Sequence, residues 1–544
     1  MTEEQAKVKW WEWAMAVGVA GVCLLSGLDA IGLLGPDEPR YAEVAREMAA
    51  SGDWVTPRLW GRTWLEKPVL SYWGAAAAMR VFGATEFAAR LPSALAALVA
   101  LVALVWAALR QYGSRTAWCV ALIFPTSVGV IGFARAAGPD ILFAAALAVA
   151  MVTAAEFVGR KGEGEEMAAG SCRNRRQEVK GATGRRIALG VALGAATLAK
   201  GPAALVLAGG SVLLWAVTTR RWRTALSLLH PWAVAAWAAT SLPWYVVCAR
   251  RNPDFVRVFL YEHNLLRYLT TAFRHEQPVW FFVVVVLIGV LPWTALLAGV
   301  ARDGWRMWNE KSWTGSAAFF YACWAVWPVL FFSVSRSKLP GYILVVVAPL
   351  AMVMARSVTS RAEARDKWTA RIGILVGITV VLLSFLASVL VYAAALELGF
   401  ENRAGVALMI VITVGSLSVS VLAGKRKVIA AGTATALIIC SMVGVLSWTV
   451  LGKVDAHYSA REAAKGVGGE PARENVYVYK VHRAWKYGLE FYQRKELAEW
   501  NEEVAMPAWV FTTREGIEEL ERKGRKVNVV EEKSANAMLV YVYR

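Results

Sequence analysis

The sequence predicts a polytopic α-helical membrane protein that ends in a small α/β domain. Of the 544 residues, 57% are hydrophobic, which is more apolar sequence than a soluble core needs. About thirteen apolar stretches are long enough to cross a bilayer. After residue 452 these stretches give way to short alternating strand and helix patterns.

Each expected span is a mainly apolar run of about 20 residues, the length that a bilayer requires. The run from 69 to 82 is apolar but only about 14 residues long, so we expect an interfacial or re-entrant helix there. The first run is too long for a secretory signal and lies far from any small-residue cleavage site, so we interpret it as a retained signal anchor. The expected spans lie near residues 13–34, 91–109, 116–133, 139–158, 187–199, 202–219, 232–249, 279–300, 315–333, 340–356, 372–397, 404–423 and 428–451.

The charge of the connecting segments predicts the orientation in the membrane. Cytoplasmic loops carry an excess of Lys and Arg. With the N-terminus in the cytoplasm, every inner loop is basic, and the C-terminus lies on the extracytoplasmic side of the plasma (inner) membrane. Counting 69–82 as a span would place the same basic loops outside. We expect the inner loop at 160–186 to be a flexible, Gly-rich connector. The inner loops are 110–115, 160–186, 220–223, 302–311, 361–371 and 425–427.

Charge and cysteine content exclude several protein classes. The net charge of +18 would suggest nucleic-acid binding in a soluble protein, but the basic residues here stand in short clusters between apolar runs. We therefore expect contacts with membrane lipids and no nucleic acid. The six cysteines are scattered and show no CxxC spacing, so neither a disulfide framework nor a thiolate metal site is indicated. We expect a monomer.

Ionisable residues gather in the outer loops and predict a functional site there. The densest group is 37–41 (Asp-Glu-Pro-Arg-Tyr) followed by 66–68 (Glu-Lys-Pro), within an outer loop at 35–90. Ionisable groups on one side of a bilayer indicate a functional site. For any single residue, helix capping or anchoring to lipid headgroups is the alternative. Further outer residues of this kind are Asp140, Lys200, His263, Arg267, His275, Lys338 and Tyr342.

Three carboxylates are candidates for catalysis: Asp37, Glu38 and Asp140. Pro39 marks the start of an amphipathic helix that ends at 51–53 and lies on the membrane. A carboxylate at its first turn is stabilised in the ionised form by the helix N-terminus, so Asp37 can accept a proton or orient an acceptor. The alternative for Asp37 is a plain helix cap.

Four basic residues are candidates for binding a phosphate. Lys and Arg are normally concentrated in cytoplasmic loops, so basic residues on the outer side need a reason. Each of the four candidates stands near a proline or glycine or at the centre of a short loop. Their natural partner is an anion at headgroup level, most simply a phosphate. The alternative is snorkelling to ordinary anionic lipids. The four residues are Lys67, Lys200, Arg267 and Lys338.

Glu66 and His263, with His275, are of the ligand types that zinc or manganese takes. They predict a divalent metal site in the outer loops. The alternative is that one histidine donates a hydrogen bond to a substrate.

The C-terminal part, 453–544, is expected to form an extracytoplasmic α/β domain beside a membrane domain of 1–452. Expected strands at 476–480, 509–512, 527–530 and 538–543 alternate with helices at 484–494 and 514–523. This domain shows no cluster of charges comparable to that of the outer loops. We expect it to shape access of an acceptor and to take no part in chemistry.

Several motifs resemble one family of membrane enzymes. They are Asp-Glu-x-Arg-Tyr-Ala-Glu-x-x-Arg-Glu-Met from 37, Glu-Lys-Pro-x-x-x-Tyr-Trp from 66, Lys-Gly-Pro from 200, Glu-His-x-x-x-Arg from 262 and Ser-Lys-Leu-Pro-x-Tyr-Ile-Leu from 337. In this order they resemble the aminoarabinose transferase (ArnT) and protein O-mannosyltransferase-like group of GT-C glycosyltransferases, over roughly residues 10 to 360.

The resemblance implies a GT-C fold and transfer of a sugar from a polyprenyl (undecaprenyl) phosphate carrier to a lipid A-like lipid or a protein on the extracytoplasmic face. It implies that Asp37 is the principal catalytic carboxylate, supported by Asp140. It also implies a metal near Glu66 and His263. Residues implied to build the donor and phosphate site are Arg40, Tyr41, Lys67, Lys200, Arg267, Lys338 and Tyr342.

Elementary chemistry agrees with that reaction. When a sugar leaves a polyprenyl phosphate, the phosphate gains about one negative charge, which fixed cations stabilise. A hydroxyl acceptor needs a base, whereas a phosphate acceptor needs only orientation. Leu65 stands where the aminoarabinose enzymes have an aromatic residue, so the sugar and the acceptor stay open.

Two other classes of protein stay open as well. A flippase or transporter of lipid-linked sugars would also need outer phosphate contacts, but it would show internal repeats and broken helices at the membrane midplane. A non-catalytic scaffold would have no use for the clustered charges.

Overall fold

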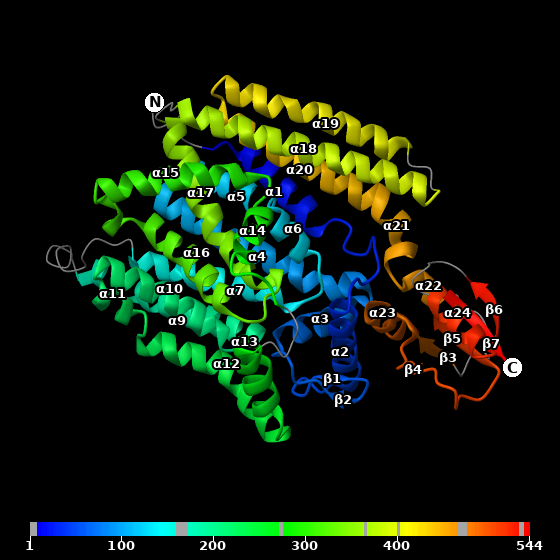
Figure 1. Cartoon of the computed structure of the whole chain (residues 1–544). Coiled ribbons are helices and arrows are strands. Elements are labelled where there is room, and N and C mark those ends of the chain that lie inside the picture. The colour runs from blue at the N-terminus through cyan, green and yellow to red at the C-terminus, as the bar shows by residue number, and fades with distance from the viewer. Residues whose placement is uncertain are drawn as a thin grey trace.

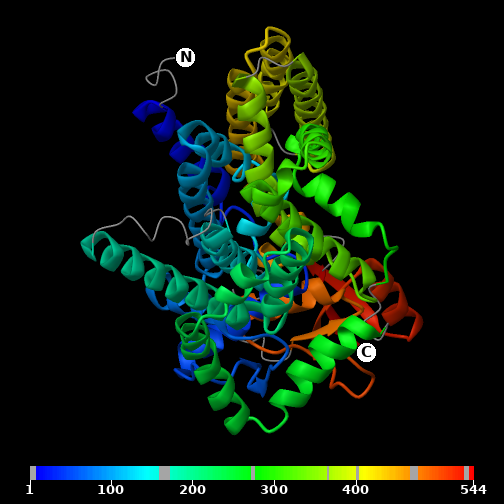
Figure 2. The ribbon, with the colours of Figure 1, turned by 90° about the vertical axis from the view of Figure 1, so that its left-hand side faces the viewer.

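The computed structural model describes residues 8–158, 172–270, 276–363, 367–399, 403–465, 476–531 and 538–544. Long helices make up most of the molecule, and a small sheet lies at its C-terminal end (Figure 1). The helices α18 (Lys367–Glu397), α19 (Arg403–Gly424) and α20 (Val428–Val445) pack together on one side of the bundle. Both views place them opposite α9 (Cys172–Lys200) and α12 (Pro231–Arg251) (Figure 1 and Figure 2).

Within the described residues, eight helices are long and apolar enough to cross a membrane, and up to ten if each bent pair is one span. This confirms a polytopic helical membrane protein. Besides α12, α18 and α19, the eight are α4 (Glu86–Tyr112), α7 (Pro139–Val158), α16 (Ala317–Val334), the stretch Pro340–Ala362 formed by η5 (Pro340–Val346) and α17 (Val347–Glu363), and the stretch Val428–Tyr458 formed by α20, η6 (Leu446–Val450) and α21 (Leu451–Tyr458).

The remaining expected spans fall on shorter or bent helices. The first is only α1 (Trp10–Leu25), and 202–219 is α10 (Ala203–Thr219). The run 187–199 is the second half of α9, whose first half replaces part of the connector expected at 160–186; residues 159–171 lie outside the described residues. The short helices α11 (Trp222–Ser227), η3 (Trp293–Ala295) and η4 (Ser312–Gly315) connect longer ones.

Two expected spans are broken by proline. The run 116–133 forms α5 (Ser114–Ile123) and α6 (Val128–Ala134), bent by 62° beyond Pro125. The run 279–300 forms α14 (Phe281–Gly289) and, after Pro292, the helix Trp293–Asn309, which contains α15 (Leu296–Asn309) and is bent by 114° from α14. Proline has no N–H for the helical hydrogen bond and clashes with the preceding turn, so an apolar run need not be one straight helix.

Small residues let the helices of the bundle approach closely. A Cβ on Gly190 of α9 would lie 2.1 Å from the carbonyl oxygen of Ala233 on α12, and one on Gly194 would lie 2.6 Å from the Cβ of Thr240. The two glycines are four residues apart and so share one helix face, the arrangement that close helix pairs in membranes use. The backbone contact of α9 with α12 therefore depends on this Gly-x-x-x-Gly segment.

The outer loop 35–90 folds into α2 (Asp37–Ser51), a hairpin of β1 (Arg58–Leu59) and β2 (Arg62–Thr63), and α3 (Leu70–Phe82). The apolar stripe of α2 is buried as expected, at Val44, Ala45 and Met48. The polar side is not solvated as expected. Glu43 is buried against Arg46, and the Glu47 carboxylate accepts hydrogen bonds from the backbone of the hairpin.

The short apolar run at 69–82 is the 13-residue helix α3, which packs on α2 and α4. Its length matches the expectation of a helix too short to span.

The C-terminal region forms a five-stranded sheet of order β4-β3-β5-β7-β6. β3 pairs in parallel with β4 and β5, and β7 pairs antiparallel with β5 and β6, so the expected α/β fold is confirmed. The division at 452/453 stays a prediction, because one long helical stretch continues through it to Tyr458. The elements are α22 (Arg461–Lys465), β3 (Val476–Tyr479), α23 (Arg483–Gln493), β4 (Ala498–Glu499), β5 (Ala508–Thr512), α24 (Arg514–Arg522), β6 (Lys526–Glu531) and β7 (Met538–Tyr543).

Candidate functional site

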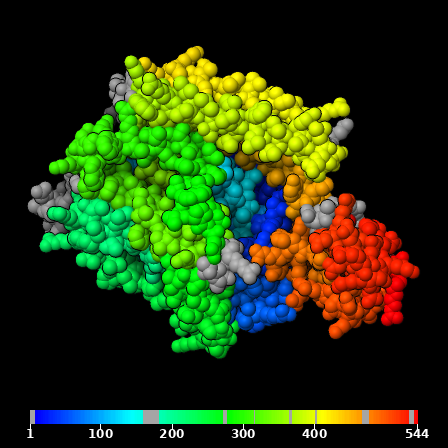
Figure 3. All heavy atoms as spheres, in the orientation of Figure 1, coloured from blue at the N-terminus to red at the C-terminus, as the bar shows by residue number. Residues whose placement is uncertain are grey.

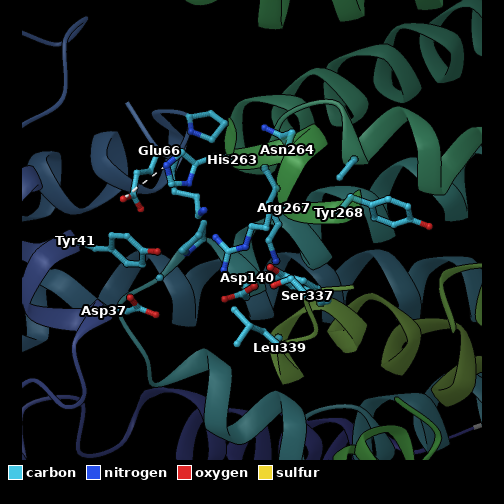
Figure 4. Close-up of a pocket in the computed structure, with 18 of the residues that line it drawn as sticks. Asp37, Tyr41, Glu66, Asp140, His263, Asn264, Arg267, Tyr268, Ser337 and Leu339 are labelled. Atoms are coloured by element: carbon cyan, nitrogen blue, oxygen red, sulfur yellow. Dashed lines mark hydrogen bonds and ion pairs between the residues drawn. The ribbon is translucent and has the colours of Figure 1, made fainter. Parts of the chain in front are cut away.

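One cavity of about 870 Å³ brings together most of the outer-loop residues that the sequence singled out: Asp37, Glu38, Arg40, Tyr41, Glu66, Lys67, Asp140, Lys200, His263, Arg267 and Tyr342. It lies where the start of α2, the loop before α3, the N-terminal ends of α7 and η5, and the segment η2 (Val256–Leu266) with α13 (Arg267–Leu269) meet. Space-filling spheres show one face of the molecule hollowed between the green helices and the orange C-terminal segment, with blue and cyan residues at the bottom (Figure 3). The labelled side chains of Asp37, Tyr41, Asp140 and Arg267 point into one shared space from these separate elements, whereas Tyr268 points away from it (Figure 4).

Asp37 is the first residue of α2, and its side chain is 58% exposed at the cavity. Its carboxylate accepts a hydrogen bond from the guanidinium of Arg40, one helical turn later. Arg40 is itself fixed, because its Nε donates to the carbonyl of Pro36 at 2.8 Å and its guanidinium lies over the Trp64 ring at 5.4 Å. No hydrogen bond joins the Asp37 carboxylate to the described helix backbone, so geometry favours an accessible charge over a plain cap.

We expected Glu38 to be a catalytic carboxylate, but its contacts are those of a residue that holds the fold together. The side chain is buried and pairs with Arg90 at 2.7 Å. Its two oxygens also accept hydrogen bonds from the backbone N–H groups of Leu34 and Ala137, each at 2.7 Å. A carboxylate held by this many donors has no accessible lone pair for a proton, so Glu38 joins three chain segments below the cavity and positions α2.

Asp140 and Lys200 form an ion pair on the cavity wall. Asp140 is the second residue of α7, and Lys200 is the last residue of α9. The Lys200 ammonium also lies 4.9 Å from the ring centroid of Tyr342. A Cβ on Gly341 would lie 2.8 Å from the carboxyl carbon of Asp140, so only glycine fits beside this pair. The pair therefore holds α7, α9 and η5 together at the cavity.

Lys67 lies in the cavity between like charges. Burial and the nearby charges of Arg267 and Lys200 together lower its pKa to about 8, against the opposing effect of Glu66 and Asp140. Among the described residues, its ammonium forms no hydrogen bond and no ion pair. An anion bound beside it would stabilise the charged form, which makes this position a natural anion site.

Arg267 and the two tyrosines complete the polar wall. The Arg267 guanidinium lies 6.0 Å from the ring centroid of Tyr342 and points toward Asp140 (Figure 4). Tyr41 packs edge to face on Tyr72 with ring centroids 6.0 Å apart. Burial and the charge of Asp37 raise the pKa of Tyr41 well above its ordinary value, so its hydroxyl stays protonated and can donate a hydrogen bond.

Glu66 and His263 approach each other, but they do not make a closed metal site. Their Oε1 and Nε2 atoms are 3.9 Å apart. Burial, Lys67 and Arg267 lower the pKa of His263 against the effect of Glu66, so the imidazole is neutral at neutral pH. No group of three His, Cys, Asp or Glu side chains gathers anywhere in the described residues, and His275 lies outside them. Among the described residues Glu66 and His263 thus supply two ligands, where catalytic zinc takes three from the protein, and the expected metal stays a prediction.

Lys338 does not face the cavity. It is only 6% exposed, and its ammonium donates to the backbone carbonyls of Ser335 at 2.6 Å and Gln277 at 3.0 Å. The structure thus assigns Lys338 to fixing the loop that precedes Tyr342, in place of the expected phosphate contact.

Arg483 and Arg90 are functional or positioning residues that sequence reasoning missed. Arg483 lines the cavity although it belongs to the C-terminal domain, which we expected to shape access of an acceptor and in which we singled out no site residue. No local pattern distinguishes it from other surface arginines. Arg90 carried a signal, because it is an arginine at the start of an apolar span, where a buried partner is needed.

The other wall of the cavity is apolar and is lined by Phe133, Val206, Phe331 and Phe332 from α6, α10 and α16. A cavity with one charged wall and one apolar wall can bind an amphiphile that has a polar head and a hydrocarbon chain.

Comparisons with known proteins support the expected resemblance. The family model described as dolichyl-phosphate-mannose-protein mannosyltransferase matches residues 32–259. An undecaprenyl phosphate-alpha-4-amino-4-deoxy-L-arabinose arabinosyl transferase of Edwardsiella ictaluri is 36% identical over 321 residues, 59% of this chain and 54% of that protein. A transferase of the same name from Yersinia pestis is 35% identical over 329 residues, 60% of this chain and 56% of that protein. The matches thus span about half the length of these curated relatives.

A solved structure shows that the likeness of fold extends over the whole chain. The crystal structure of ArnT from Cupriavidus metallidurans bound to undecaprenyl phosphate aligns with a TM-score of 0.74 and 23% identity, covering 98% of this chain and 97% of that one. The apo oligosaccharyltransferase of Archaeoglobus fulgidus aligns with a TM-score of 0.51 and 13% identity, covering 90% and 65%. The chain therefore shares the fold of the ArnT structure, and the expected GT-C fold is confirmed.

Proposed function

We propose that this protein is an integral membrane glycosyltransferase that moves a sugar from a polyprenyl (undecaprenyl) phosphate carrier to an acceptor on the extracytoplasmic face. The observation that carries the proposal is the cavity itself. It combines an accessible carboxylate at Asp37, the partly buried cations Lys67 and Arg267, and an apolar wall.

The cations fit the charge that the reaction creates. The acceptor oxygen attacks the anomeric carbon of the sugar, and the bond from that carbon to the phosphate oxygen breaks, with the electron pair leaving on the phosphate. The phosphate thereby gains negative charge, which donors already fixed in the cavity stabilise more in the transition state than in the ground state. Lys67 fits this role best, because its ammonium has no partner among the described residues.

Asp37 acts on the acceptor. If the acceptor is a hydroxyl, the Asp37 carboxylate takes its proton as the new bond to the sugar forms. If the acceptor is a phosphate, which is already ionised, Asp37 orients it and balances positive charge that develops on the sugar. Arg40 holds the carboxylate in place through their ion pair.

Asp140 and Lys200 position the phosphate site. Their ion pair places the Lys200 ammonium over the ring of Tyr342, the same ring that lies beside Arg267. A charge fixed at this point raises the positive potential around Lys67 without itself needing to touch the donor.

The names of the curated relatives suggest which donor and which acceptor this protein uses. Curated relatives are named for transfer of aminoarabinose from undecaprenyl phosphate, so a pentose or hexose on that carrier is the proposed donor. A lipid A-like lipid is the proposed acceptor, with protein as the alternative. We propose a monomer in the plasma (inner) membrane with the N-terminus in the cytoplasm and the cavity on the extracytoplasmic side.

A donor-cleavage assay tests the proposal. Purified protein in detergent is given undecaprenyl phosphate linked to radiolabelled 4-amino-4-deoxy-L-arabinose, with and without a membrane extract, and the products are separated by mass. Transfer of label to the extract, or slow release of free sugar to water, supports a transferase. A lipid flippase, the alternative that the bent helices would suit, would leave the sugar–phosphate bond intact in the same assay.

A further inference from the structure

The C-terminal domain contributes one side chain to the cavity, that of Arg483. Arg483 is the first residue of α23, and this helix packs beside α2 (Figure 1). Tyr487 stands one helical turn later and therefore on the same face of α23. The guanidinium of Arg40 lies 5.1 Å from the ring centroid of Tyr487, so this face of α23 is turned toward the pair of Arg40 and Asp37.

The position of α23 is fixed by buried polar contacts with the membrane domain. The Tyr492 hydroxyl accepts from the backbone N–H of Leu33 at 2.9 Å and donates to the Glu86 carboxylate at 2.9 Å. A Cβ on Gly32 would lie 2.8 Å from the same hydroxyl, so the tip of the Tyr492 side chain packs directly against the backbone at Gly32. These contacts place α23 against the membrane domain and its first residue, the exposed Arg483, at the cavity.

The charge of Arg483 has no partner in the described structure. Asp37 is paired with Arg40 and Asp140 with Lys200, and Arg483 forms no hydrogen bond or ion pair with any described residue. An arginine without a protein partner at a cavity can bind the anionic group of a ligand, because its planar guanidinium can donate two parallel hydrogen bonds to a phosphate or a carboxylate.

We propose that Arg483 binds an anionic group of the acceptor, in the simplest case a phosphate, and so makes the C-terminal domain part of the acceptor site. This inference rests on the proposed sugar transfer. The donor phosphate has its own cations, Lys67 and Arg267, which come from the membrane domain. Arg483 instead comes from the domain beside Asp37, the carboxylate that faces the acceptor.

The test compares Arg483→Ala and Arg483→Lys with the wild-type full-length protein. The donor is undecaprenyl phosphate-linked 4-amino-4-deoxy-L-arabinose, and the acceptor is lipid A with its phosphates. We expect Arg483→Ala to raise the KM for lipid A by about tenfold, the effect of losing one charged hydrogen-bond partner. Donor hydrolysis without acceptor should stay within about twofold, and Arg483→Lys should recover part of the loss because it keeps the charge.

Lys486→Ala provides the matched control. Lys486 lies on the same helix, but its ammonium pairs with Glu499 at 3.2 Å and it does not line the cavity. This variant removes one positive charge from α23 and should leave both the KM for lipid A and donor hydrolysis unchanged. An equal rise in KM in the Lys486 variant would show a general charge effect and overturn the assignment.

Equilibrium binding to protein loaded with undecaprenyl phosphate gives a readout besides turnover. Wild type should bind phosphorylated lipid A more tightly than dephosphorylated lipid A, and Arg483→Ala should lose this preference. Equal binding of the two lipids by wild type would overturn the inference. A parallel loss of donor hydrolysis in Arg483→Ala would overturn it too, because the arginine would then serve the donor phosphate. Failure of the proposed function is a separate result, in which wild type does not cleave the donor at all.

Discussion

At the scale of single residues, the neighbouring carboxylates Asp37 and Glu38 differ in exposure and in the number of hydrogen bonds that they accept. Asp37 is exposed at the cavity with one partner, whereas Glu38 is buried among four donors. We expect Asp37→Asn to lower transfer by about 10²- to 10⁴-fold with unchanged donor binding, because the amide keeps the shape but cannot take a proton. Glu38→Gln should instead lower the thermal midpoint, because the buried charge of Arg90 loses its ion-pair partner and keeps only its hydrogen bonds to backbone carbonyls. Turnover and thermal unfolding of both variants check this; an active, unstable Asp37→Asn would contradict it.

Lys67 predicts the pH dependence of donor use. Its pKa is lowered to about 8, so in the free protein the ammonium loses its charge as pH rises through that value. We expect kcat/KM for donor hydrolysis to fall above about pH 8, by up to tenfold per unit. Lys67→Arg should have low activity in the tight Glu-Lys-Pro turn, but no fall in this range because arginine stays charged.

The lowered pKa of Lys67 affects folding stability in the opposite direction to donor use. Between pH 8 and the ordinary lysine pKa of about 10.4, the unfolded chain holds a proton that the folded chain has lost. This group therefore makes the folded state relatively more stable as pH rises through that window, while donor use declines. A fall of both quantities together above pH 8 would mean that another group is titrating.

At the scale of elements, the contact of α9 with α12 depends on backbone approach. We expect Gly190→Ala and Gly194→Ala each to destabilise the fold by about 1–3 kcal/mol, because the added methyl meets backbone or Thr240. Gly209→Ala on α10 is the control, since a Cβ there meets nothing within 4 Å. Thermal unfolding in detergent measures the difference. Equal midpoints for Gly194→Ala and Gly209→Ala would show that the two helices can separate without cost.

At the scale of the whole molecule, the sheet domain and the bundle share one ion-pair network. Arg461 joins Asp455 at 2.6 Å and Glu86 at 3.3 Å, and the Asp455 carboxylate accepts from the backbone of Gly32 at 2.7 Å. We expect Arg461→Ala to loosen the domain and to reduce transfer to lipid A more than donor hydrolysis, because Arg483 and the acceptor site move with α23. A protein truncated after Lys453 should show the same split, provided that it still folds. Loss of donor binding in either protein would instead place the domain within the donor site.

The orientation in the membrane is a second prediction at this scale. In a Cys172→Ser background, an Arg494→Cys variant in the C-terminal domain should react with an impermeant thiol reagent in intact cells, and an Arg426→Cys variant in an inner loop should not. Both positions are exposed, so labelling reports the side of the membrane and not burial. The reverse pattern would invert the topology.

The sequence by itself determined the class of the protein and the parts of the chain that build the site. Apolar length is a local property, and so most of the spans and the short helix α3 could be predicted without a structure. Loop charge is local too, but the outer position that it gives to Asp37, Lys67, Asp140 and Arg267 stays a prediction. The pattern could not show that two spans bend, because one proline in an apolar run changes its hydropathy little.

Only the tertiary structure decided which charged residues are available. Glu38, Lys200 and Lys338 look as accessible in sequence as Asp37 and Lys67, yet folding gives each of them a partner from a distant segment. Arg483 is the opposite case. Its sequence context gives no sign of a function, yet the packing of the C-terminal domain places it at the cavity. The physical reason is that hydrophobicity is a property of a segment, whereas the pairing of a charge depends on which other segments approach it, and that is settled only when the whole chain has packed.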